Sequence, residues 1–258
     1  MNPLAADNAG YVTSVVQDKV AFISFFHPKG NSLSKELLLK LTESVSFAGN
    51  ESGVNAVVLR ADGGSSFCAG ASFDELCALR DQSAAEEFFL GFYHLMTAIM
   101  QCPVPVVARV SGKVVGGGVG VVAASDYSIA SADASARLSE ITLGIGPFVI
   151  GPVVAKKMGV GNFETMMFGA EWCTAEWCER KGLYSAVATK GDGALDNQLS
   201  SLLSKLQASP REALVQSKRL CCADFHYSEQ EARERAAIVG ALALRSECQE
   251  RLAAFKTK

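Results

Sequence analysis

A glycine-rich segment near the middle of the chain holds the residues best suited to close contact with a ligand. Three glycines, 116–118, follow a β-branched strand pattern at 104–110. They overlap the start of a small-residue helix pattern at 117–124. Glycine has no Cβ, so its backbone N–H can face a ligand directly. The first N–H groups of a helix have no partner inside the helix and can hold an anion. We therefore expect Gly117 to offer a backbone donor to a developing negative charge.

A second small-residue turn precedes the first in the chain. It consists of Phe67-Cys68-Ala69-Gly70-Ala71 and follows a loop at 62–66. Two such turns brought together would point two N–H groups at one oxygen, which is an oxyanion hole. Each donor of this kind is typically worth roughly 10²–10³ in rate. Either turn alone is better explained by glycine's use in tight turns and in helix–strand packing.

Glu140 is a lone carboxylate in an otherwise apolar neighbourhood at 138–148. Burial among apolar side chains raises the pKa of a carboxyl group, because it penalises the charged form. A pKa near the operating pH is what a group that accepts and returns a proton needs. The residues alone leave a solvated surface acid as the alternative.

A competing interpretation is a dinucleotide-binding fold. The string from Gly118 to Ala123 fits the pattern G-x-G-x-x-A, and Glu140 follows Gly120 by about 20 residues, where a ribose-binding acid is expected. Against this, the helix pattern already begins at Gly117, the string lies deep in the chain, and the turn at 67–71 stays unexplained.

Composition and charge restrict the class of protein. The 258 residues are 49% hydrophobic and 20% charged, as in an ordinary globular chain, and the net charge of −3 with no basic run argues against a nucleic-acid partner. Arg109 and Lys113 interrupt the best apolar run before it reaches the roughly 18–20 residues of a membrane span. Residues 1–10 lack the pattern of a secretory signal. We expect a cytoplasmic protein, or one in another reducing compartment.

The cysteines and histidines predict no metal site. None of the eight cysteines forms a C-x-x-C pair, and the three histidines are far apart in the chain. We expect reduced cysteines that fill small apolar gaps. The cysteines are at 68, 77, 102, 173, 178, 221, 222 and 248, and the histidines at 27, 94 and 226.

The elements that position these segments follow from local patterns. An opening hairpin is expected, then alternating strands and helices, with a long helix opened by a capping box of Ser83 and Glu86. The expected strands are 11–16, 20–26, 54–60, 104–110, 127–130 and 136–138. The expected helices in this part begin at 32, at 83 and at 117.

Past residue 151 the patterns are helical. Gly182 is expected to cap one helix, Ser209 with Pro210 to open another, and Ser228 with Glu231 to form a capping box. The expected helices are 152–158, 175–181, 210–222, 228–245 and 248–255. This order predicts an α/β core at 1–195 followed by a helical region at 196–258, as one cooperative unit.

Along nearly its whole length the chain resembles the enoyl-CoA hydratase/isomerase (crotonase) family. The motifs stand in the family's order and at compatible spacings, which makes the joint signal strong. The resembling segments are Lys29 with 31–33 (the family's early CoA-binding loop), 67–71 (its first oxyanion turn), 105–118 with 125–127 (its second turn and the next strand), 138–145 (its catalytic-carboxylate segment), and 209–218 with 252–255 (its C-terminal helices).

The resemblance implies a ββα spiral core, a C-terminal helical trimerisation region, and a homotrimer or a dimer of trimers. It implies an acyl-CoA thioester as substrate, with no separate cofactor. The implied catalytic groups are Glu140 and the N–H groups of Ala71 and Gly117. The implied substrate-binding residues are Lys29, Asn31, Ala69, Gly70 and Gly116, with Leu143 and Phe148 expected against the acyl chain.

Two departures from the family pattern affect the expected reaction. Family hydratases usually have two glutamates, but the first position is Gly120 here, and Ser72 replaces an acid that often follows the first turn. A single base that moves one proton suits Δ3-Δ2 enoyl-CoA isomerisation, and the segment from Glu140 to Phe148 resembles that of single-glutamate isomerases. Enoyl-CoA hydration stays open as an alternative, with Asp74 or Glu75 as a second acid. A decarboxylase, a hydrolase or a non-catalytic CoA-ester binder also stays open.

Overall fold

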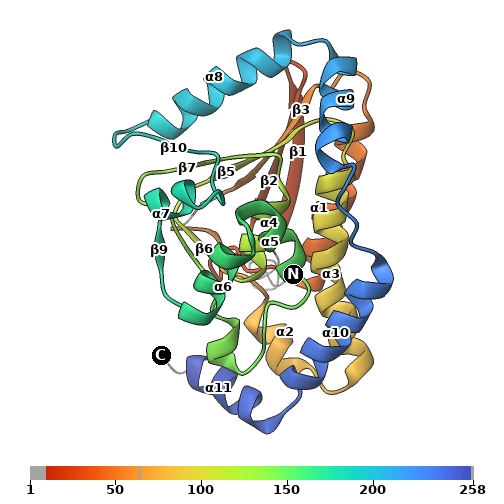
Figure 1. Cartoon of the computed structure of the whole chain (residues 1–258), viewed down its shortest axis with the longest axis vertical. Coiled ribbons are helices and arrows are strands. Elements are labelled where there is room, and N and C mark those ends of the chain that lie inside the picture. The colour runs from red at the N-terminus through yellow and green to blue at the C-terminus, as the bar shows by residue number, and fades with distance from the viewer. Residues whose placement is uncertain (1–9, 64, 257–258) are drawn as a thin grey trace, which may run out of the picture.

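The computed structural model describes residues 10–63 and 65–256, and shows a mixed α/β fold (Figure 1). The first nine residues of the predicted core and Gly64 of the predicted loop lie outside these ranges. The strands are β1 (Tyr11–Gln17), β2 (Val20–Phe26), β3 (Ala56–Ala61), β4 (Ser66–Cys68), β5 (Val106–Val110), β6 (Lys113–Val115), β7 (Tyr127–Ala130), β8 (Ser135–Arg137), β9 (Cys173–Thr174) and β10 (Ala186–Val187).

Helices cover the strands and form most of the second half of the chain (Figure 1). Among the described residues, none of them is long and apolar enough to span a bilayer. They are α1 (Lys35–Asn50), α2 (Phe73–Ala78), α3 (Gln82–Gln101), α4 (Gly117–Ala124), the 3₁₀ turn η1 (Glu140–Leu143), α5 (Gly151–Met158), α6 (Val160–Gly169), α7 (Ala175–Arg180), α8 (Ala194–Ala208), α9 (Arg211–Cys222), α10 (Glu229–Ala243) and α11 (Ser246–Lys256).

The larger sheet has six strands in the order β1-β2-β3-β5-β7-β10. The β1–β2 pair is antiparallel, which confirms the predicted hairpin, and every other pair in this sheet is parallel. The central strand β3 is buried along nearly all of its length, as expected for a parallel strand that is covered on both faces. One of these faces packs against α8 through Leu195, Leu199 and Leu203.

A smaller sheet, in the order β4-β6-β8-β9, carries the segments singled out in the sequence. Its first three strands are parallel, with Cys68 opposite Val114 and Val115 opposite Arg137. The carboxyl ends of parallel strands meet at one edge of a sheet. The residues that follow these three strands are therefore brought together.

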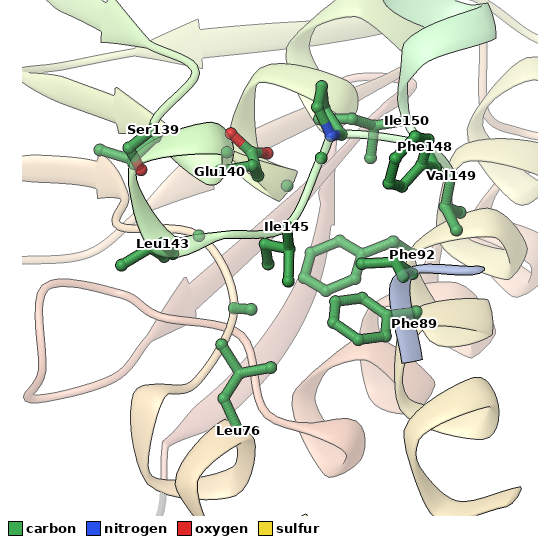
Figure 2. A pocket seen from close by; sticks show the side chains of 18 of the residues that line it. Leu76, Phe89, Phe92, Ser139, Glu140, Leu143, Ile145, Phe148, Val149 and Ile150 are labelled. Carbon is green, nitrogen blue, oxygen red and sulfur yellow. The ribbon is translucent and has the colours of Figure 1, made fainter. Parts of the chain in front are cut away.

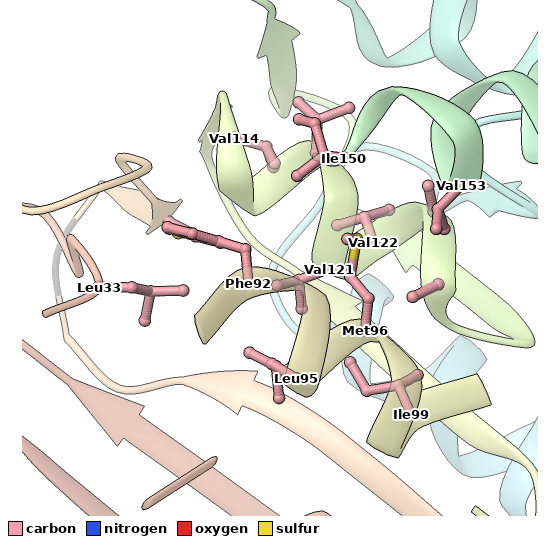
Figure 3. Close-up of a cluster of buried hydrophobic side chains, with 14 of the residues drawn as sticks. Leu33, Phe92, Leu95, Met96, Ile99, Val114, Val121, Val122, Ile150 and Val153 are labelled. Carbon is pink, nitrogen blue, oxygen red and sulfur yellow. The ribbon is translucent and has the colours of Figure 1, made fainter. Parts of the chain in front are cut away.

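The main core lies where α3 and α4 meet (Figure 3). The α3 face with Phe92, Met96 and Ile99 is buried, so this apolar face of the helix serves packing. The α4 helix is buried on nearly all sides. A fully buried helix has little room for large side chains, which accounts for its glycine, alanine and valine composition.

Two predicted N-caps were wrong, and the helix predicted from residue 32 begins at Lys35. The long helix α3 begins at Gln82, and its N-cap is Asp81, whose carboxylate accepts a hydrogen bond from the Ala84 N–H at 2.9 Å. Ser209 is the C-cap of α8 rather than the N-cap of α9, because α8 extends up to it. The predicted capping box of Ser228 and Glu231 is confirmed.

Candidate active site

Strand register places Ala71 and Gly117 at the same edge of the smaller sheet. Cys68 of β4 pairs with Val114 of β6. Ala71 and Gly117 each lie three residues further along the chain, just past the ends of these strands. The two turns also touch, since a Cβ added to Gly70 would lie 3.0 Å from the Val115 carbonyl oxygen and 3.8 Å from the Gly117 nitrogen. Gly70 has φ +91°, a conformation that favours glycine.

Both amides are left free by the local hydrogen bonding. Ala71 forms a parallel β-bridge with Leu33. The Leu33 N–H donates to the Gly70 carbonyl and the Ser72 N–H donates to the Leu33 carbonyl, so the bridge does not use the Ala71 N–H. Gly117 is the first residue of α4, where an N–H has no helical acceptor. Within the described ranges neither N–H has an acceptor in the protein, and both residues line one cavity.

The third strand of the small sheet delivers Glu140 to the same place. Val115 pairs with Arg137, Gly116 N–H donates to the Arg137 carbonyl at 3.0 Å, and η1 begins three residues later. A Cβ added to Gly116 would lie 3.1 Å from Glu140 Oε1. Gly116 has φ +54°, so both its conformation and this close approach require glycine.

Glu140 faces the cavity as a partly buried acid. Its Oε2 is buried and has no hydrogen-bond partner among the described residues. Burial raises the pKa of Glu140 from 4.5 to about 7, against the opposing effect of backbone hydrogen bonds at Glu140 and Ser139. Such a carboxyl group exchanges its proton near neutral pH.

The cavity has a volume of about 70 Å³ and a mostly apolar wall (Figure 2). Among the described residues that line it, Glu140 is the one that ionises, and Ser139 contributes a hydroxyl group. The wall is formed by Ala69, Gly70, Ala71, Phe73, Leu76, Phe89, Phe92, Val115, Gly116, Gly117, Ser139, Glu140, Leu143, Ile145, Gly146, Pro147, Phe148, Val149, Ile150 and Val239. Two backbone donors and one base in an apolar cavity can stabilise an oxyanion while a proton moves on a neighbouring carbon.

Eight of the ten candidate site residues line this cavity, whereas Lys29 and Asn31 lie beside it. The Lys29 ammonium pairs with Asp74, at the start of α2. Asn31 is buried and bonded within the protein, since its amide donates to the Ser66 carbonyl at 2.8 Å and its oxygen accepts from the His27 N–H at 2.8 Å. Asn31 therefore holds the loop at 27–31 against the 66–71 turn.

The neighbouring acids do not add a second carboxylate to the cavity. Asp74 pairs with Lys29, and Glu75 accepts a hydrogen bond from the Lys35 N–H at 2.8 Å. Neither lines the cavity. Ser72, in place of an acid, caps α2 by accepting from the Glu75 N–H.

Position 120 has no room for a side chain. A Cβ added to Gly120 would lie 2.8 Å from Ile150 Cγ2 and 3.0 Å from Met96 Sδ. Gly118 is equally close to Cys68, at 2.7 Å from its Cβ. Both glycines lie inside α4 and serve helix packing, which contradicts the dinucleotide interpretation, where they would form a turn between strand and helix.

We expect Gly120→Ala to lower the free energy of unfolding, measured by urea denaturation. Overpacking of a core typically costs about 1–3 kcal/mol, which outweighs the gain of about 1 kcal/mol from replacing glycine in a helix. The matched control is Gly161→Ala in α6, where an added Cβ would meet nothing within 4 Å. Equal stability of the two variants would contradict overpacking of the core by a Cβ at position 120.

Part of the cavity wall was not predicted from the sequence. Leu76 of α2, Phe89 of α3 and Val239 of α10 line the cavity and lie outside the motifs, whereas Ile145 lies inside the 138–145 motif but was not named as a site residue. The available signal was that Phe89 lies on the predicted long helix, but the helix that packs against it was unknown. The contact between α3 and α10 joins residues that are far apart in the chain, so local sequence patterns do not predict it.

Comparison with known proteins gives one family. A family model described as enoyl-CoA hydratase/isomerase matches residues 16–258. A short-chain-enoyl-CoA hydratase of Clostridium acetobutylicum is 28% identical over 205 residues, which cover 79% of this chain and 77% of that protein. A (7aS)-7a-methyl-1,5-dioxo-2,3,5,6,7,7a-hexahydro-1H-indene-carboxyl-CoA hydrolase of Mycobacterium tuberculosis is 34% identical over 125 residues. That match covers 48% of this chain and only 50% of the hydrolase.

Solved structures agree on the fold. The crystal structure of an enoyl-CoA hydratase from Bacillus halodurans superposes with a TM-score of 0.85 at 21% identity, covering 95% of this chain and 99% of that one. The predicted crotonase-like α/β fold is confirmed by this match. The trimerisation role of the C-terminal helices stays a prediction.

Proposed function

We propose, since this chain belongs to the enoyl-CoA hydratase/isomerase family, that it binds an acyl-CoA thioester and isomerises a 3-enoyl-CoA to the conjugated 2-enoyl-CoA. The observation that carries this choice within the family is the single base. Glu140 is the one ionising group among the described cavity-lining residues, and the place of a second glutamate, position 120, is filled by Ile150 and Met96.

In the proposed reaction, the acyl carbonyl oxygen accepts hydrogen bonds from the Ala71 and Gly117 N–H groups. The Glu140 carboxylate removes a proton from C2, and the electron pair moves into the C1–C2 bond as negative charge develops on the thioester oxygen. The two amides stabilise this dienolate. Glu140 then returns the same proton to C4, and the double bond moves from C3–C4 to C2–C3. One carboxyl group acts first as base and then as acid, so no second one is needed.

Enoyl-CoA hydration is the second candidate, because the relatives with a stated activity on enoyl-CoA are hydratases by name. Hydration adds water across C2–C3, so one group must activate the water while a proton is delivered to C2. The cavity offers Glu140 for one of these tasks, and Ser139 is the hydroxyl-bearing side chain among its described lining residues. A third candidate, binding of CoA esters without turnover, applies if neither reaction proceeds.

Ultraviolet absorbance of the thioester distinguishes these three functions. Isomerisation of 3-enoyl-CoA raises the absorbance as the double bond becomes conjugated, whereas hydration of 2-enoyl-CoA lowers it. We expect the rise with 3-enoyl-CoA to be the faster reaction. Faster loss of absorbance with 2-enoyl-CoA contradicts the proposal in favour of a hydratase, and no change with either substrate, while CoA esters still bind, favours a binding protein.

The pH dependence of the isomerisation gives a separate prediction. Because Glu140 must be deprotonated to act as base and burial raises its pKa to about 7, kcat/KM should increase about tenfold per pH unit below pH 7 and level off above it. Initial rates between pH 5 and 9 measure this. A profile that is flat across pH 5–7 contradicts the role of Glu140 as a buried base.

The CoA part of the substrate and the assembly complete the proposal. We place the CoA moiety along Lys29 and the backbone of residues 69–71, next to the donor at Ala71.

We also propose a homotrimer or a dimer of trimers, built through the C-terminal helices, as the resemblance to the family implies. Light scattering in solution measures the mass of the assembly.

A further inference from the structure

One wall of the cavity comes from two helices that meet far from the catalytic turns. Phe92 of α3 lies against the oxyanion turn, because a Cβ added to Gly117 would lie 2.1 Å from its ring. Phe89 is three residues earlier on the same face of α3, and Ala85 is one further turn away. In Figure 2, Ile145 lies between Glu140 and the Phe89 ring. The Phe89 side of the cavity is therefore remote from the reacting atoms.

At that remote side, α10 packs closely on α3. A Cβ added to Gly240 would lie 3.1 Å from the Ala85 Cβ, and Gln82 donates a hydrogen bond to the Ala237 carbonyl at 2.8 Å. This close approach lets Val239, which is 1% exposed, reach the cavity beside Phe89, which is 8% exposed. Phe89 and Val239 thus form the part of the cavity wall where α10 packs on α3.

The size of the cavity limits the length of the acyl chain. A water-sized group takes about 30 Å³, so a cavity of about 70 Å³ holds about two to three such groups. With the thioester carbonyl seated at the two donors, this leaves room for about two to three further carbons, which makes a chain of about three to four carbons.

We propose that this protein takes short acyl chains, of about four carbons, and that Phe89 and Val239 set the limit. This inference rests on the proposed function, because it assumes that the acyl group occupies the cavity beside Glu140. The substrate class is therefore a short, uncharged acyl-CoA thioester whose terminal carbon faces the α3–α10 wall.

Binding of saturated acyl-CoA thioesters tests the wall without any reaction. We expect affinity, measured by isothermal titration calorimetry with acetyl-, butanoyl-, hexanoyl-, octanoyl- and decanoyl-CoA, to increase about fourfold per added CH₂ up to about four carbons. In the wild type it should then stop increasing or decrease. In Phe89→Ala the increase should continue to eight carbons, and Val239→Ala should shift the limit in the same direction.

Two neighbours provide matched controls. Phe88 is buried next to Phe89, and Ile238 is half exposed next to Val239, but neither lines the cavity. Phe88→Leu and Ile238→Ala should leave the limit where it is in the wild type. Val239→Ala and the milder Phe89→Leu test the same wall if Phe89→Ala does not fold, as judged by circular dichroism.

The possible outcomes separate this inference from the proposed function. Affinity that keeps increasing to ten carbons in the wild type would contradict the proposed length limit. An unchanged limit in both the Phe89 and the Val239 variants would contradict the role of these two residues. The expected length limit together with no isomerisation of 3-enoyl-CoA supports the wall and overturns the isomerase. Isomerisation of four-carbon and ten-carbon substrates at equal kcat/KM supports the isomerase and overturns the wall.

Discussion

Replacing Glu140 by glutamine should lower kcat for 3-enoyl-CoA by about 10²–10⁴, the range that a positioned acid–base group contributes. The amide has nearly the shape of the carboxyl group, so it should fit between Gly116 and the apolar wall, but it cannot accept and return the proton. The substrate contacts of the Ala71 and Gly117 amides are retained. KM should therefore change only a few-fold, and the loss should lie in kcat.

The neighbouring residue supplies the control for this experiment. Ser139 also lines the cavity but does not ionise in this range, so Ser139→Ala should retain most of the isomerase activity. Calorimetric titration with butanoyl-CoA should show that Glu140→Gln still binds. Isomerisation by Glu140→Gln at more than a tenth of the wild-type kcat would show that another group moves the proton.

The same substitution should have a large effect on stability, and that effect should depend on pH. Glu140 has a pKa of about 7 when folded and 4.5 when unfolded. Below pH 4.5 both states hold the proton and the group does not affect stability. Between pH 4.5 and 7 the unfolded chain loses the proton while the folded protein keeps it, so folding becomes less favourable as pH rises. Above pH 7 this penalty is constant at about 3 kcal/mol.

Glutamine carries no charge and escapes this penalty. The free energy of unfolding of Glu140→Gln minus that of the wild type should therefore increase by about 2–3 kcal/mol between pH 5 and pH 8. Urea denaturation of both proteins at several pH values measures this difference, and other titrating groups cancel in it. A difference that is independent of pH would mean that Glu140 is solvated in the folded protein. Both large effects thus depend on burial of one carboxyl group.

Local sequence patterns predicted only part of the end of the cavity that holds Ala71, Gly117 and Glu140. The helix at 117–124 was predicted with the bounds that α4 has, because a glycine run after a strand leaves few alternatives. The proximity of Ala71, Gly117 and Glu140 did not follow from local patterns. It follows from the parallel register of β4, β6 and β8, three short strands of which only the last was predicted.

Other parts of the fold were missed for identifiable reasons. The helix α8 has leucines at 195, 199 and 203 on one buried face, but it begins after Gly193 without a side-chain cap, so the usual start signal is absent. The short helix α2 has a single buried residue, Leu76, which is too little for a periodic pattern. The role of Val239 depends on how α10 returns to α3, which is decided by packing between residues far apart in the chain.

That return of α10 has a consequence for biosynthesis. The chain emerges from the ribosome with its amino end first, so both oxyanion amides and Glu140 are synthesised before Val239. Until α10 has emerged and packed on α3, the cavity lacks one wall. A ligand of this cavity can then stabilise only a chain in which α10 is already packed, which links ligand binding to that step of folding.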